Sequence, residues 1–208
     1  MSSTFAQPAP GKPLVFDYAR CGNPTRLALE RQLATLECAD FAFATNSGMS
    51  SNVTIMNLCS RGDHVLCVDD VYGGTARYLR TILSPNADIE VSFVDFNVIS
   101  EFKKHLKPNT KIVWMETPTN PTLKIFDIQK VAQACKAHGA LLCVDNTFSS
   151  PVNCNPLNLG ADIVTHSLTK YIGGHSDMIA GCICLNDRAL YDRIFYVLKS
   201  MGTGLDAF

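Results

Sequence analysis

The sequence predicts an α/β protein: a mostly parallel, seven-stranded sheet with helices on both faces, giving three layers. Seven short runs rich in apolar and β-branched residues recur along the 208-residue chain, and stretches long enough for helices separate most of them. Strands that alternate with helical patterns are typical of a parallel sheet. The composition, 47% hydrophobic and 18% charged, suits a single globular domain with a sizeable core.

The order of elements follows from these runs. The strands are expected at residues 41–45, 65–68, 90–94, 112–115, 141–144, 163–165 and 181–185. Helices are expected at residues 50–59, 74–83, 99–106, 128–138 and 187–199. Another helix should run from Pro24 to Glu37, because Asn23-Pro24 can start it and leucines recur at near-helical spacing. Residues 1–16 contain three prolines and a glycine, so they are expected to form an extended arm.

Charge and cysteine content narrow the class of protein. The formal net charge of −1 gives no footprint for nucleic acid or an anionic membrane surface. No apolar run approaches the ~20 residues of a membrane span, and no signal peptide is expected at the amino terminus. The nine cysteines are scattered without C-x-x-C spacing, which argues against a metal site. They favour a reducing, cytoplasmic compartment.

The segment around Lys170 is the strongest functional signal from the residues themselves. A short buried strand at 163–165 leads to the hydroxyls of Ser167 and Thr169 and then to Lys170. Ligands of open α/β sheets bind at this carboxyl end of the strands. The hypothesis is that Lys170 carries an aldehyde cofactor as a Schiff base, a known use of lysine nucleophiles. The alternative is a solvated surface lysine.

A second signal is Asp145, which directly follows the buried run 141–144. A carboxylate at the end of a buried strand needs a partner, because leaving it unpaired is costly. The pyridinium N–H of pyridoxal phosphate is one such partner. An aspartate that caps the next helix or pairs with a structural arginine is the alternative.

Three further strand ends carry polar or aromatic groups. The glycine-containing turn 45–51 leads into a helix amino terminus, which suits a phosphate, although Ser47 or Ser50 could simply be an N-cap. Tyr72, beside two glycines, could stack on a planar ring or be an ordinary loop tyrosine. Asn120 lies in a loop fixed by two prolines and could be a rigid hydrogen-bonding group or part of a plain turn. The absence of G-x-G-x-x-G after the first strand argues against a dinucleotide-binding oxidoreductase.

Five segments, in one order along nearly the whole chain, resemble the cysteine/methionine-metabolism family of pyridoxal-phosphate enzymes: residues 18–26, 70–75, 116–121, 144–148 and 167–171. The resemblance implies the aspartate-aminotransferase-like fold, the large domain of pyridoxal-phosphate fold type I. It also implies pyridoxal 5′-phosphate as cofactor.

The resemblance further implies a role for each matching residue. Lys170 would be the Schiff-base lysine and would then shuttle protons, and Asp145 would pair with the ring nitrogen. Tyr72 would stack on the ring and help in proton transfer, Thr147 would lie near the face of the cofactor, and Asn120 would contact the cofactor or the substrate carboxylate. The residues implied for the phosphate are Ser47, Gly48, Met49, Ser167 and Thr169, with Tyr18 and Arg20 reaching the phosphate of a neighbouring subunit. Residues expected to be structural or supporting are Arg77, Glu116, His166 and His175.

The domain organisation and activity are also carried over from the resemblance. Residues 1–26 would be an arm that contributes to a neighbouring subunit's site, and residues 27–208 the cofactor domain, with the family's C-terminal small domain absent. The implied assembly is a homodimer or homotetramer with shared active sites. The implied reaction is carbon–sulfur cleavage in transsulfuration, by γ-elimination of L-cystathionine to cysteine, 2-oxobutanoate and ammonia. The family's β-elimination and γ-synthase reactions remain open, as does a truncated chain that binds cofactor without turnover. Gly74 stands where methionine γ-lyases typically carry a cysteine, which argues against that branch.

Overall fold

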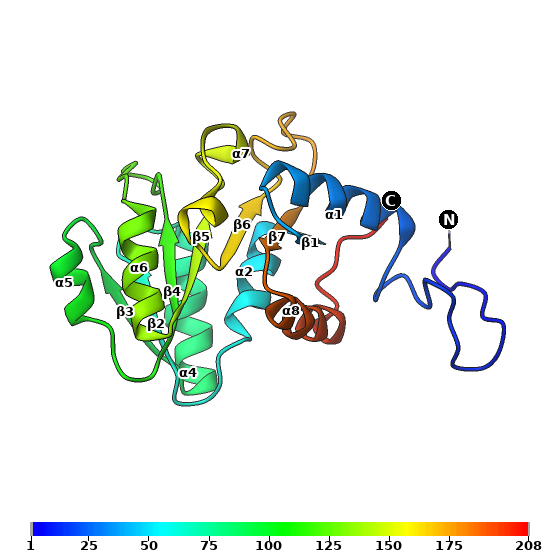
Figure 1. Ribbon diagram of the computed structural model, residues 1–208, viewed down its shortest axis with the longest axis horizontal. Coiled ribbons are helices and arrows are strands. Elements are labelled where there is room, and N and C mark those ends of the chain that lie inside the picture. The colour runs from blue at the N-terminus through cyan, green and yellow to red at the C-terminus, as the bar shows by residue number, and fades with distance from the viewer. Residues whose placement is uncertain (1, 208) are drawn as a thin grey trace.

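The computed structural model describes residues 2–207 and shows one seven-stranded sheet between two layers of helices (Figure 1). The strands are β1 (Phe41–Thr45), β2 (His64–Val68), β3 (Glu90–Val94), β4 (Thr110–Glu116), β5 (Leu141–Asp145), β6 (Ile163–Ser167) and β7 (Gly181–Leu185). Their order across the sheet is β1-β7-β6-β5-β4-β2-β3. All pairs are parallel except those that β7 makes with β1 and β6, so the predicted fold class is confirmed.

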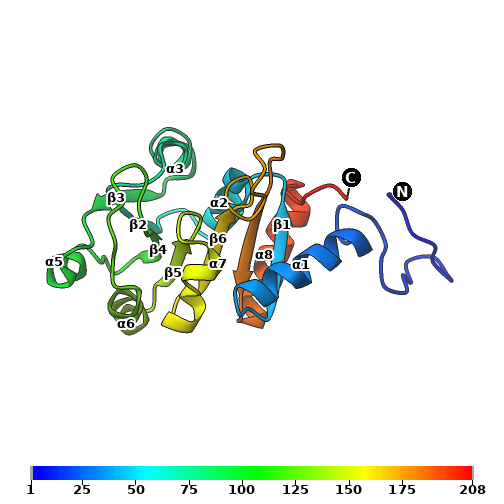
Figure 2. The same cartoon turned by 90° about the horizontal axis from the view of Figure 1, so that it is seen from above.

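Helices cover both faces of the sheet. They are α1 (Pro24–Leu36), α2 (Gly48–Met56), α3 (Gly73–Tyr78), α4 (Ser84–Ala87), α5 (Ile99–Lys104), α6 (Ile128–His138), α7 (Ser150–Asn153) and α8 (Arg188–Met201), with short helical turns η1 (Leu79–Leu83) and η2 (Pro156–Leu159). Figure 2 shows α2 and α3 on one face and α1, α5 and α6 on the other, and α8 packs against α2. No helix within residues 2–207 combines the length and hydropathy needed to cross a membrane.

The interior strands of the sheet are covered on both sides. Every residue of β2 and β7 is buried, as expected for strands with helices on both sides. Trp114 of β4 is the largest fully buried side chain of the core. The apolar runs of the sequence are therefore the interior strands of the sheet.

Local signals set the helix ends. Asn23 caps α1 by accepting a hydrogen bond from the Thr25 N–H at 2.8 Å, and Asp127 caps α6 by accepting one from the Lys130 N–H at 3.1 Å. Gly139 ends α6 with a left-handed φ of 85°, which glycine adopts without steric cost.

The structure differs from the sequence prediction in one helix. The expected helix at 74–83 is instead α3 followed by the π-helical turn η1 and then α4. The apolar spacing of Leu79 and Leu83, both buried, does not reveal this change of winding, because an i→i+5 turn keeps both on the core side. Residues 2–22, which precede α1, hold only the isolated bridges Thr4–Tyr18 and Ala9–Lys12. Met1 and Phe208, the ends of the predicted domains, lie outside the described residues.

The reversed direction of β7 matters for the site. Its first residue, Gly181, pairs with Thr45 and with Ser167, the last residues of β1 and β6. A Cβ on Gly181 would lie 2.4 Å from the carbonyl oxygen of Ser47. Only glycine allows the turn after β1 to approach so closely.

Candidate active site

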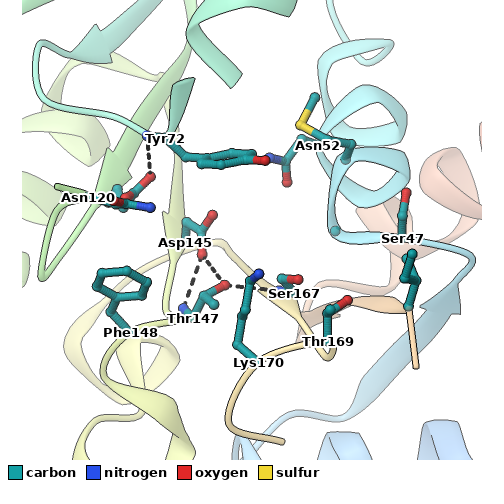
Figure 3. A pocket seen from close by; sticks show the side chains of 14 residues that line it. Ser47, Asn52, Tyr72, Asn120, Asp145, Thr147, Phe148, Ser167, Thr169 and Lys170 are labelled. Carbon is teal, nitrogen blue, oxygen red and sulfur yellow. Dashed lines mark hydrogen bonds between the residues drawn. The ribbon is translucent and has the colours of Figure 1, made fainter. Parts of the chain in front are cut away.

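A cavity of about 570 Å³ opens at the carboxyl ends of the parallel strands. Its lining residues are Ser47, Gly48, Met49, Asn52, Tyr72, Glu116, Asn120, Asp145, Thr147, Phe148, Ser167, Thr169, Lys170 and Ile179. Figure 3 shows these side chains converging from separate elements. Every site residue predicted from the sequence lines this cavity except Tyr18 and Arg20.

Lys170 lies in the tight turn that follows β6. The Lys170 N–H donates to the Ser167 carbonyl at 3.2 Å, and the Gly174 N–H donates to the Lys170 carbonyl at 2.8 Å. The Thr169 hydroxyl accepts from the Ala180 N–H at 3.2 Å, which ties the start and end of this loop together. The Lys170 side chain points into the cavity, toward the side on which Asp145 and Tyr72 lie (Figure 3). Its amine is thus available to a bound molecule.

Asp145 lines the cavity from the end of β5. Its Oδ1 accepts hydrogen bonds from the Thr147 N–H at 3.0 Å and the Thr147 hydroxyl at 2.6 Å, and Thr147 Oγ1 accepts from the Ser167 N–H at 2.9 Å. Burial raises the pKa of Asp145, although the Thr147 hydrogen bonds and the charge on His166 oppose the rise. In the described part of the chain, Asp145 has no ion-pair partner within 4 Å. A bound cationic N–H would satisfy it.

Glu116 is a second buried acid in the cavity wall. Its Oε2 accepts from the Tyr72 N–H at 3.0 Å, and the Asn120 backbone also donates to it. Burial raises its pKa to about 8, and the nearby charge of Asp145 adds to the rise. The expectation of a merely supporting role is thus incomplete, because Glu116 lines the cavity and joins the two loops that carry Tyr72 and Asn120.

Tyr72 covers the cavity from the opposite side. It precedes α3, is 47% exposed, and its ring lies above Asp145 and Lys170 (Figure 3). A Cβ on Gly74 would lie 2.5 Å from Tyr72 Cε1 and 3.1 Å from Met49 Sδ. The second glycine after the tyrosine therefore gives the ring room to lie flat over a planar ligand.

The amino terminus of α2 forms the remaining wall. Ser47 is the N-cap, with Oγ accepting from the Ser50 N–H at 3.0 Å, so the N-cap reading of this turn is confirmed. The first N–H groups of the helix, at Gly48 and Met49, have no intrahelical acceptor and suit an anion. A Cβ on Gly48 would lie 2.9 Å from Ser167 Cβ, so glycine lets the end of β6 come close. The same turn can cap the helix and bind a phosphate.

Tyr18 and Arg20 do not reach the cavity. Arg20 Nη1 donates to the Lys199 carbonyl, and its guanidinium lies 5.5 Å from the Tyr18 ring centroid. His166 is buried and pairs with Glu37, whereas His175 is exposed and bonds the Gly173 carbonyl at 2.8 Å. Arg77 is exposed on α3.

Sequence reasoning missed three lining residues: Asn52, Phe148 and Ile179. Asn52 is 4% exposed, and its Nδ2 donates to the Thr75 hydroxyl at 3.0 Å. Its place one helical turn after Gly48 was a usable signal, and Phe148 directly follows the Asp145-Asn146-Thr147 run. Ile179 lies in the returning loop, where no pattern points to it.

The donor set fits pyridoxal 5′-phosphate. An amine faces the cavity, the half-buried acid Asp145 has no cationic partner among the described residues, an aromatic ring covers a flat space, and helix N–H groups with nearby hydroxyls suit a phosphate. The cavity and the sheet together define the large domain of a fold-type I pyridoxal-phosphate protein.

Comparison with known proteins agrees with this class. The family model described as "Cys/Met metabolism PLP-dependent enzyme" matches residues 1–208, and the chain belongs to this family. It is 47% identical over 203 residues to the cystathionine gamma-lyase of Dictyostelium discoideum, covering 97% of this chain and 52% of the relative. It is 46% identical over 206 residues to the cystathionine beta-lyase MetC of Staphylococcus haemolyticus, covering 99% and 52%.

A solved structure, that of metB from Corynebacterium glutamicum, superposes with a TM-score of 0.96 at 42% identity. The superposition covers all of this chain and 54% of that protein. The chain thus spans about half the length of the curated relatives it matches.

Proposed function

We propose that this chain forms the cofactor-binding part of a pyridoxal-phosphate-dependent carbon–sulfur lyase of transsulfuration. The proposed reaction is γ-elimination of L-cystathionine to cysteine, 2-oxobutanoate and ammonia. The observation that carries the proposal is one cavity in which the Lys170 side chain points toward the side where the half-buried carboxyl of Asp145 lies. The many relatives named cystathionine gamma-lyase, at 45–47% identity, support the choice of substrate.

When bound, pyridoxal phosphate supplies an electron sink for the carbanions that cleavage of a γ carbon–sulfur bond requires. In this proposal Lys170 would hold the cofactor through its aldehyde carbon and would move protons at the α and β carbons of the substrate. Asp145 accepts a hydrogen bond from the ring nitrogen and stabilises its positive charge. Tyr72 packs on the ring and assists proton transfer.

The other cavity residues would bind and orient. The residues proposed to hold the phosphate are Ser47, Gly48, Met49, Ser167 and Thr169. Thr147 holds Asp145 through the 2.6 Å hydrogen bond from its hydroxyl and so fixes the direction of the carboxylate. Glu116 links the loop of Asn120 to the loop of Tyr72. Asn120 would bind the cofactor or the substrate carboxylate.

The arm supports a shared-site assembly. Tyr18 and Arg20 lie outside the cavity, and Tyr18 is 42% exposed, as expected if they serve the phosphate of a neighbouring copy in a homodimer or homotetramer. Residues 1–26 would be this arm and residues 27–208 the cofactor domain. The nine cysteines are all free, which supports a reducing, cytoplasmic location.

A second candidate is β-elimination of the same substrate, favoured by the relative named cystathionine beta-lyase MetC. The γ-synthase reaction of the family is a third candidate. β-Elimination of cystathionine would release homocysteine and pyruvate instead of cysteine and 2-oxobutanoate, so identifying the keto acid separates the two lyases.

The test is Lys170→Ala against the control Lys130→Ala, an exposed lysine that pairs with Asp127. Wild type and control should bind pyridoxal phosphate with a visible absorption band and, after borohydride reduction, carry it on Lys170. The Lys170→Ala variant should show neither. Borohydride labelling of another lysine in the wild type would contradict the site. A wild type that binds cofactor but releases no keto acid from cystathionine would favour a chain without turnover.

A further inference from the structure

Three buried polar side chains lie beneath the cavity without lining it: Glu37, Asn146 and His166. Glu37 is the C-cap of α1, Asn146 follows β5, and His166 belongs to β6. They are 1%, 0% and 1% exposed. None has a role in the proposed chemistry, but Asn146 directly follows Asp145 and His166 directly precedes Ser167.

One carboxylate oxygen joins the three elements. Glu37 Oε1 accepts from Asn146 Nδ2 at 2.9 Å and also contacts His166 Nε2 in a short hydrogen bond. Asn146 Nδ2 donates in addition to the Cys154 carbonyl at 2.8 Å, and its backbone N–H donates to the Thr165 carbonyl at 3.0 Å. The ends of β5 and β6 are thereby fixed to each other and to the end of α1.

The position of His166 relative to Asp145 follows from strand register. Asp145 pairs with Thr165 in the β5–β6 ladder, and His166 comes one residue later. The next residues, Asn146 and Ser167, flank the same point, and the Ser167 N–H holds Thr147, which in turn holds Asp145. A displacement of His166 would therefore be transmitted to Asp145 through two hydrogen bonds, from the Ser167 N–H to Thr147 and from the Thr147 hydroxyl to Asp145.

The charges around His166 favour its imidazolium form. The groups that face it are Glu37 from α1, Asp145 from β5 and Cys182 from β7. Burial alone would lower the pKa of His166, but the hydrogen bond to Glu37 and the neighbouring acidic groups outweigh burial and raise it. A buried Glu37 without this cation would be an unpaired charge, which is strongly destabilising.

We propose that His166 is a positioning residue: held by Glu37, it fixes the ends of β5 and β6 and keeps a positive charge behind Asp145, so that Asp145 stays ionised toward the ring nitrogen. A buried ion pair is seldom more stabilising than an apolar pair of the same volume, so stability alone does not account for it. The proposal rests on the proposed function, because it assumes that Asp145 holds the ring nitrogen.

The test uses the purified protein loaded with pyridoxal phosphate labelled with ¹⁵N in the ring. Glu37→Gln keeps an oxygen for Asn146 but removes the charge that holds His166 as a cation. We expect the fraction of ring nitrogen that carries a proton at neutral pH to fall, because Asp145 then competes for that proton, and the affinity for pyridoxal phosphate to fall about tenfold. Glu30→Gln is the matched control, because Glu30 is a buried acid of the same helix that bonds the Ala44 N–H, and it should change neither.

A second variant guards against a folding defect. The apolar double variant Glu37→Leu/His166→Leu should keep the thermal midpoint of unfolding near that of the wild type, yet show the same two shifts. Wild-type nitrogen titration and affinity in either variant would overturn the proposal. Failure of the wild type to bind the cofactor through Lys170 would instead overturn the proposed function, so the two failures are distinguishable.

Discussion

On one side of the cavity, the amino terminus of α2 and the hydroxyls of Ser167 and Thr169 face the interior; on the other side lie the carboxyl groups of Asp145 and Glu116. The first wall is made of neutral groups whose dipoles favour an anion. The second wall is made of acids whose charge depends on burial and on each other. The walls suit the opposite ends of one ligand, a phosphate and a cationic ring.

The two walls should therefore differ in their sensitivity to changes of volume and to changes of pH or charge. Backbone N–H groups and hydroxyls do not titrate near neutral pH, but they depend on close contacts such as that of Gly48 with Ser167. The acids of the other wall should instead be insensitive to small changes of volume and sensitive to pH and charge. The predictions below test this contrast, beginning with the largest expected effect.

Removing the charge of the acidic wall should have the largest effect. Asp145→Asn should weaken binding of pyridoxal phosphate roughly 100-fold, because loss of one partner of a buried charged hydrogen bond costs about 3 kcal/mol. Equilibrium titration of the purified protein measures the loss. The control Asp95→Asn changes an acid that bonds Lys124 away from the cavity and should bind normally. Equal affinity of the Asp145→Asn variant and the wild type would remove the acid from the cofactor site.

The second prediction concerns the stability of the cofactor-free protein. Folding raises the pKa of Glu116 from 4.5 to about 8, so the folded state binds this proton more tightly than the unfolded state. The contribution is fully present below pH 4.5 and is lost as the pH rises to about 8. Each pH unit between these two values removes about 1.4 kcal/mol.

Urea unfolding of wild type and Glu116→Gln at several pH values measures this contribution. Burial raises the pKa of Glu30 to about 7, so Glu30 also causes a loss of stability as the pH rises. The Glu116→Gln variant keeps this loss. The two curves should therefore diverge steadily between pH 4.5 and about 8, and above pH 7 the wild type alone should still lose stability. Parallel curves over this range would show that Glu116 titrates normally.

The smallest predicted effect tests the neutral wall. Gly48→Ala places a Cβ 2.9 Å from Ser167 Cβ, so the helix start or the end of β6 must move. We expect about tenfold weaker binding of pyridoxal phosphate, a change of about 1.4 kcal/mol, at every pH between 6 and 9. Pyridoxal without the phosphate should lose less.

The matched control is Gly73→Ala, where a Cβ meets no heavy atom within 4 Å. It should bind as the wild type does. An equal loss for pyridoxal and its phosphate in the Gly48→Ala variant would contradict an anion site at α2.

The cavity was largely predictable because the topology of a parallel sheet brings residues that are distant in the sequence to one edge. Tyr72, Asp145 and Lys170 are far apart in the chain, yet each follows a strand, and the carboxyl ends of parallel strands meet at one edge. The pairing of Glu37 with His166 could not be predicted. Glu37 appears in the sequence as an ordinary helix end, and its partner depends on how α1 docks against β6. For the same reason the sequence predicts only a structural or supporting role for Glu116: its orientation depends on the neighbouring loop that carries Tyr72.

The reversed strand β7 also dictates when this domain can be completed during synthesis. Within residues 2–207, β1 is an edge strand that pairs with β7 and forms a single bridge with Gly204, and both partners come long after β1 in the sequence. Until then the nascent protein exposes an unpaired edge with Phe41 and Phe43, a feature that invites aggregation and chaperone binding. Gly181 meets Ser47 only when that edge closes. The wall that the turn after β1 gives to the cavity is therefore complete only after β7 has paired with β1.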